Sequence, residues 1–129
     1  MPILVTSLYA ALLAIVCIVL SAPVGLMRGK KQIALGDSGD PEMIVTIRRH
    51  ANFIEYVPLA LILMALVELN GGSKTWVHAL GAVLVVARIV HPFGLDTKNL
   101  NKWQRIAGTA VTLLVIAAAA ITLLWQYFR

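Results

Sequence analysis

Four long apolar segments determine what this chain can fold into. Residues 2–27 carry no charged side chain, and no charge follows Arg105 until the final Arg129. A helix needs about 20 apolar residues to cross the ~30 Å hydrocarbon core of a bilayer. The chain has 129 residues, is 60% hydrophobic and 13% charged, and has a mean hydropathy of +0.85. The sequence therefore predicts one all-α integral membrane domain over residues 1–129, a bundle of four transmembrane helices without a separate soluble domain.

Local signals predict where the helices begin and end. Asp40-Pro41 has the form of an N-cap followed by proline at the first helical position, and residues 70–73 read Asn-Gly-Gly-Ser, a turn. Pro92 and Gly94 interrupt the third segment. The second helix is long, ~45 Å, so its start should project beyond the hydrocarbon core. The expected helices are roughly 2–27, 41–70, 74–93 and 103–128.

The basic residues predict the orientation in the membrane. The first cluster, Arg28, Lys30 and Lys31, follows the first apolar run, whereas a signal peptide has its positive charges before that run. The net charge of +5 comes from short connections and not from a patch with stacking aromatics, so no nucleic-acid partner is expected. Nine lysines and arginines lie on the side of the first and third connections, against Lys74 and Arg129 on the other. The positive-inside rule puts both termini outside and the basic side in the cytoplasm.

Neither cysteine nor histidine predicts a metal site. Cys17 is the sole cysteine, which excludes an intrachain disulfide and a cysteine-based zinc site, and it reads as a small hydrophobe. His50 and His91 could in principle ligate haem or a metal in a four-helix bundle. Neither has a companion ligand three or four residues away, so no metal is expected.

The second helix carries a polar stripe near its start. At about 100° per residue, Arg48, Asn52 and Glu55 fall within roughly 60° of one another, and Arg49 and Tyr56 share a neighbouring stripe. Ionisable residues in a span are costly to desolvate and usually mark a functional site. The alternative is structural pairing with neighbouring helices. We interpret the stripe as part of an inward-facing pocket, with the first and fourth helices facing lipid.

The third and fourth helices add polar groups at the same end. Arg88 and His91 are three residues apart and share a helix face, and Arg105 lies at the start of the fourth helix. Arginines are forked donors for carboxylates, Glu55 can accept an ammonium, and Asn52 can bond a peptide unit in both directions. A small ligand with two carboxylates, one ammonium and two amides matches this set.

The run Arg48-x-x-x-Asn52-x-x-Glu55-Tyr56-x-Pro58, followed by Arg88-x-x-His91, resembles the MAPEG family, the membrane-associated proteins in eicosanoid and glutathione metabolism. The resemblance covers essentially the whole chain and is strongest to the little-characterised bacterial branch. It implies a homotrimer in the bacterial inner membrane that binds glutathione, or a related thiol, between neighbouring subunits near the cytoplasmic face. Membrane lipids and a lipophilic substrate from the bilayer are the other implied partners.

The resemblance also implies residue roles. Arg105 would stabilise the glutathione thiolate and is the expected catalytic residue, because a nearby cation converts a thiol into a nucleophile. The chain departs from the eicosanoid-forming branch at Ala51, Leu95 and Ile106, where that branch has polar residues, so prostaglandin or leukotriene synthesis is not expected. The implied glutathione contacts are Arg28 from the neighbouring subunit, Arg48, Asn52, Glu55, Tyr56, Arg88 and His91.

The predicted function is glutathione-dependent transferase or peroxidase activity on lipophilic electrophiles at the membrane. The alternative is a catalytically silent membrane protein that binds a small anion or has a structural role. A small transporter is a weaker hypothesis, because the charges of the second and third helices lie at the helix ends. A relay of ions would need charges near the middle of the bilayer.

Overall fold

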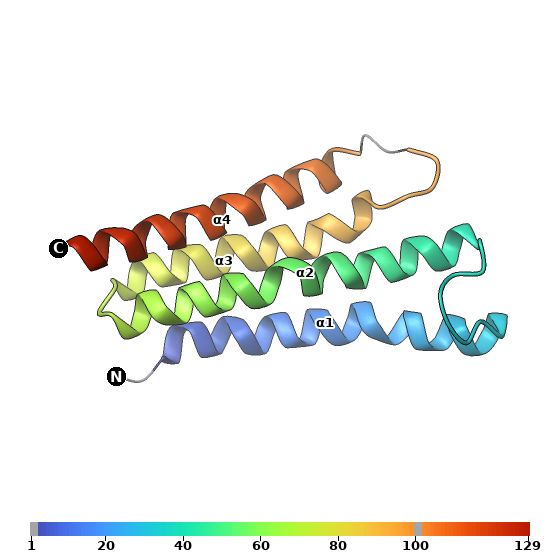
Figure 1. Ribbon diagram of the computed structural model, residues 1–129, viewed down its shortest axis with the longest axis horizontal. Helices are drawn as coiled ribbons and strands as arrows, with labels where there is room; N and C mark the ends of the chain where they lie inside the picture. Colours follow the sequence, from blue (N-terminus) through green and yellow to red (C-terminus); the bar gives the residue numbers. More distant parts are fainter. Residues whose placement is uncertain (1–2, 100–101) are drawn as a thin grey trace.

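The structure, a computed structural model, describes residues 3–99 and 102–129. Within those residues four long helices run back and forth as an antiparallel bundle (Figure 1), and each is long and apolar enough to cross a membrane. The prediction of an all-α bundle with four membrane-spanning helices is confirmed. The elements are α1 (Leu4–Lys31), α2 (Pro41–Leu69), α3 (Lys74–Val90), the 3-10 helix η1 (His91–Gly94) and α4 (Trp103–Phe128).

The bundle has two chemically different ends. The α1–α2 and α3–α4 connections lie together at what we call the basic end, on the right of Figure 1. Both termini and the α2–α3 turn lie at the opposite end, which we call the terminal end. At the basic end α2 projects past the end of α3, as the length of its polar first turns predicts.

Helix α1 is longer than its sequence predicts. It continues past residue 27 to Lys31 and ends where Gln32 takes a left-handed conformation with φ 54°. Pro23 lies inside the helix without ending it, and Arg28, Lys30 and Lys31 occupy the last turn, where cations interact favourably with the helix dipole. The expected start at residue 2 lies outside the described residues.

Helix α2 starts where the sequence predicts. The Asp40 carboxylate accepts the Met43 backbone N–H at 2.8 Å, and Pro41 stands at the first position, which needs no hydrogen-bond donor. The helix continues through Pro58, whose ring lies on the exposed side. Proline is tolerated there because the helix is held by its neighbours and not by local propensity alone.

The core lies mainly along α2 and α3, while α1 and α4 expose more of their apolar surface, in agreement with the lipid-facing role expected for them. Two glycines allow close helix contacts: Gly81 lies against the ring of Tyr9, and Gly108 lies against His91, where a Cβ would approach that of His91 to 2.6 Å. The contact at Gly108 fixes the start of α4 against η1. The largest buried core side chains include Leu13, Met43, Met64, Val67, Val77 and Leu84.

The terminal end contains a buried acid that was not predicted from the sequence. Glu68 is only 5% exposed, and its carboxylate accepts the backbone N–H groups of Val5 at 2.9 Å and Thr6 at 2.8 Å. It also accepts the Thr6 hydroxyl at 2.7 Å. Helix α1 has no side-chain cap of its own at Ile3, so Glu68 of α2 supplies the missing acceptor and ties the two helices together.

Candidate functional site

The polar stripe of α2 lies on the outside of the bundle. Arg48 and Glu55 form a two-pronged ion pair, with Nη1–Oε1 at 3.1 Å and Nη2–Oε2 at 3.2 Å. Their side chains are 49% and 47% exposed. The expectation that this pair points into the bundle is wrong, because Phe53 and Val57 occupy the inner face of α2 at this level and are buried in the core. The pair faces outward from the bundle.

Asn52 connects this stripe to the interior. Its side-chain oxygen accepts a hydrogen bond at 2.8 Å from Nη2 of Arg88 on α3. Arg88 is 0% exposed and its guanidinium lies 5.7 Å from the centre of the Phe53 ring, a cation–π contact. Its Nε and Nη1 atoms are buried and have no hydrogen-bond partner among the described residues. A buried cation with two unpaired donors is costly and can bind an anion or an acceptor.

Two further predicted residues, His91 and Arg105, lie near one another where α3 meets α4. His91 is buried, and its Nδ1 has no partner among the described residues. Arg88 and Arg105 are both within electrostatic range of His91. Arg105 is exposed, and its backbone packs against Gly94, where no larger residue would fit. The η1 turn therefore brings Arg105 to the neighbourhood of the buried Arg88 and His91.

Tyr56 lies near the buried Arg88, whereas Arg28 makes its contacts elsewhere. Tyr56 is half-buried, and like Glu55 it lies within electrostatic range of Arg88. Arg28 instead bonds to the α1–α2 connection of its own chain, donating from Nη1 to the carbonyls of Gly36 at 2.9 Å and Ile33 at 3.4 Å. Within one chain the predicted set thus forms a cluster at the basic end, with Arg28 held in the adjacent connection.

Arg49 was not predicted as a site residue. Its Nη2 donates to the Leu95 carbonyl at 3.0 Å, and its Nε is buried without a partner among the described residues. It lies next to Arg48 in the chain but about 100° further around α2. The sequence signal for Arg49 is its position directly after Arg48. Two adjacent residues of a helix lie on different faces, so Arg49 must contact a different part of the structure from Arg48.

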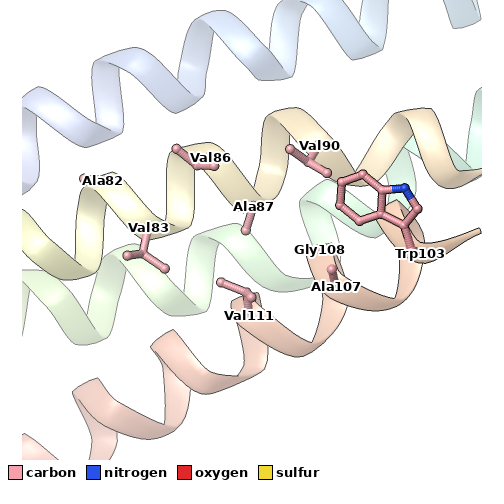
Figure 2. A pocket seen from close by; sticks show the side chains of 9 residues that line it. All are labelled: Ala82, Val83, Val86, Ala87, Val90, Trp103, Ala107, Gly108 and Val111. Atoms are coloured by element: carbon pink, nitrogen blue, oxygen red, sulfur yellow. The ribbon is translucent and has the colours of Figure 1, made fainter.

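An apolar groove of about 390 Å³ runs between α3 and α4 on the bundle surface (Figure 2). Val86 and Val90 line it from α3, Val111 lines it from α4, and Trp103 lies at one end. Trp103 is two residues before Arg105. Among residues 3–99 and 102–129, no three histidine, cysteine, aspartate or glutamate side chains come together as a metal site would require.

Comparison with known proteins places the chain in a family. The family model described as MAPEG family matches residues 6–125. Two curated relatives, both named Inner membrane protein YecN, come from Escherichia coli strain K12 and Escherichia coli O6:H1. Each is 34% identical over 122 residues, which cover 95% of this chain and 92% of the relative. No solved structure matches significantly. With its four spans and these relatives, the chain is a multi-pass protein of the bacterial inner membrane, and it belongs to the MAPEG family.

Proposed function

We propose that this protein is a glutathione-dependent transferase or peroxidase that acts on lipophilic electrophiles, and that it works as a homotrimer. Membership of the MAPEG family supports thiol chemistry in general terms. The observation that carries the proposal is the outward-facing pair of Arg48 and Glu55, about half exposed on a helix that spans the membrane. Charges facing hydrocarbon cost several kcal/mol, so a polar ligand and a neighbouring subunit are the natural cover for this surface.

The chemistry of the cluster suits glutathione. The ligand has two carboxylates, an ammonium, two amides and a thiol. Arg48 and the unpaired donors of Arg88 suit the carboxylates, and Glu55 suits the ammonium. Asn52 and Tyr56 offer hydrogen bonds to the peptide units, and His91 closes the buried side. Arg28 of a neighbouring subunit completes the set in this proposal.

Arg105 is the proposed catalytic residue. Its guanidinium would hold the glutathione sulfur as a thiolate, which is the nucleophilic form. In the transferase reaction the thiolate attacks an electrophilic carbon, a carbon–sulfur bond forms, and the leaving group departs with its electron pair. In the peroxidase reaction the thiolate attacks the terminal oxygen of a hydroperoxide, which releases an alcohol and leaves a sulfenic acid. A second glutathione then yields water and the disulfide.

The apolar groove between α3 and α4 supports the lipophilic half of the proposal. It is lined by apolar side chains, it lies on membrane-spanning helices, and it ends at Trp103, close in the chain to Arg105. A lipophilic substrate can reach this groove from the bilayer without crossing water. By the positive-inside rule the basic end faces the cytoplasm, where glutathione is available.

A second candidate is a catalytically silent membrane protein that binds a small anion. Leu95 favours it, because an aliphatic side chain stands where the eicosanoid-forming branch has a tyrosine, and its carbonyl is already bonded by Arg49. Such a protein would retain the binding cluster without activating a thiol.

The test is calorimetric titration of the detergent-solubilised protein with glutathione, with the ultraviolet absorbance of the thiolate followed in parallel. We expect Arg48→Ala to weaken binding by ~1–3 kcal/mol, because a charge-assisted contact is lost. Arg105→Ala should retain binding but lose the thiolate absorbance and turnover of a model electrophile. Lys74→Ala, at the terminal end, is the matched control and should change neither.

Two results would contradict the proposal. Absence of glutathione binding by the wild-type protein would remove thiol chemistry altogether. Binding without a thiolate signal in the wild type would favour the silent anion binder.

A further inference from the structure

Two cavities meet at the basic end, on a different side of α2 from the Arg48–Glu55 pair. One has a volume of about 480 Å³ and contains the side chains of Glu42, Arg49, Asp96 and Lys102. The other, about 230 Å³, is mainly apolar. Both are lined by Thr46 and Arg49, so they lie next to each other. We call this adjoining pair the two-part cavity, polar at one end and apolar at the other.

The polar part contains charges of both signs. Arg49 and Lys102 bring two positive charges, and Glu42 and Asp96 bring two negative ones, of which Glu42 is also paired with Lys31 at 2.7 Å. Lys102 Nζ lies 2.8 Å from Asp96 Oδ2, and this hydrogen bond lowers the pKa of the Asp96 carboxyl to about 2, so it stays charged at neutral pH. Arg49 has a buried Nε without a partner among the described residues. A cavity with both signs of charge suits a zwitterion better than a simple anion.

The apolar part extends from this boundary into the membrane-spanning region. It is lined by Val19, Leu20 and Pro23 of α1 and by Phe93 of η1. Val19 and Phe93 are largely exposed on the bundle surface, so this part opens sideways towards lipid. A chain leaving the polar part through this opening would enter the bilayer directly.

We infer that this two-part cavity binds a phospholipid with a zwitterionic headgroup from the surrounding leaflet. The phosphate lies by Arg49 and Lys102, the ammonium lies by Glu42 and Asp96, and one acyl chain follows Val19, Leu20 and Phe93. The apolar groove between α3 and α4 has no charged side chain to select a headgroup. Because Arg49 and Arg48 lie on different faces of α2, this lipid site is separate from the proposed thiol site and does not depend on it.

Lipid retention during purification tests the inference. The protein is extracted in mild detergent and its bound lipid is identified by native mass spectrometry. The delipidated protein is then titrated with short-chain phosphatidylethanolamine, phosphatidylglycerol or inorganic phosphate. We expect one phosphatidylethanolamine per chain and weaker binding of the other two probes. Arg49→Gln should weaken phosphatidylethanolamine binding about tenfold or more, because a charge-assisted contact to phosphate is lost.

Two further variants keep the test decisive. Val19→Trp fills the opening of the apolar part at an exposed position and should lower lipid retention even if Arg49→Gln does not fold. Arg48→Gln is the matched control, which should retain the lipid whether or not glutathione binds to the wild type. Equal binding of phosphatidylglycerol, competition by inorganic phosphate, or unchanged retention in Val19→Trp would each overturn the inference.

Discussion

The buried polar groups at the two ends of the bundle differ in whether they have hydrogen-bond partners. At the terminal end, the Glu68 carboxylate accepts three hydrogen bonds from the start of α1, and the Tyr9 hydroxyl is 3.1 Å from Nδ1 of His78. At the basic end, Arg49, Arg88 and His91 all have buried nitrogens without a partner among the described residues. The terminal end has one such atom, Oε1 of Gln126, but that amide also donates to the Val67 carbonyl at 3.2 Å.

This difference separates structural from functional polarity. A buried polar group that is fully bonded stabilises the fold, whereas one left unpaired lowers stability unless a ligand satisfies it. The terminal end therefore holds α1 to α2, and the basic end contains donors available to a bound molecule. Sequence position alone does not make the distinction, because both groups lie near the ends of membrane spans.

The largest expected effect belongs to Glu68. Glu68→Ala removes the acceptor for three donors at the start of α1 and should lower the free energy of unfolding by ~2–4 kcal/mol, since each unpaired buried donor costs ~1–3 kcal/mol. Unfolding of the detergent-solubilised protein, followed by circular dichroism, measures the loss. Glu42→Ala is the control: its side chain is 74% exposed in the first turn of α2, so losing its ion pair with Lys31 should cost much less. Equal losses in the two variants would break the comparison.

The second effect concerns Arg88. Arg88→Met keeps an unbranched buried side chain and removes a cation with two unpaired donors, so the unfolding free energy should stay unchanged or rise by up to ~2 kcal/mol. The same variant should lose the stabilisation that glutathione gives to the wild type. Thermal unfolding with and without glutathione measures both quantities. Marked destabilisation of the unliganded variant would show that Arg88 is as structural as Glu68.

Much of the fold could be predicted because local chemistry determines it. Span length gives four helices, and Asp40-Pro41 gives the start of α2. The end of α1 was predicted too early, at residue 27 where the apolar run ends, because the helix continues through the basic residues to Lys31. A polar stripe was predicted from spacing alone, but spacing does not reveal which side of α2 packs on the core. That depends on Phe53 and Val57, which are buried with α3.

The missed contacts have a similar cause. The hydrogen bond between Asn52 and Arg88 depends on how far α2 and α3 are shifted along their axes relative to each other, which no local sequence pattern predicts. Glu68 could have been found, because a single acid in the last turn of an apolar helix needs a donor, and residues 3–6 at the same end begin a helix without an N-cap side chain. Matching this acid, which needs donors, with the helix start, which needs an acceptor, predicts the contact between Glu68 and the start of α1.

The smallest effect concerns the connections at the basic end, which are held by partly exposed ion pairs. The hydrogen bond from Lys102 lowers the pKa of Asp96 to about 2, and that from Lys31 lowers the pKa of Asp40. A carboxyl with a lowered pKa contributes stability that is complete above its ordinary value near 3.8 and is lost as the pH falls through the lowered value. Acidification towards pH ~2 should therefore raise the normalised amide exchange rate of Lys98, whose N–H bonds to Asp96. Asp96→Asn should remove this pH dependence, while Asp40→Asn should leave it intact. If the wild-type Lys98 amide is equally protected at neutral pH and at pH ~2, then packing, and not the ion pair, holds the connection at the basic end.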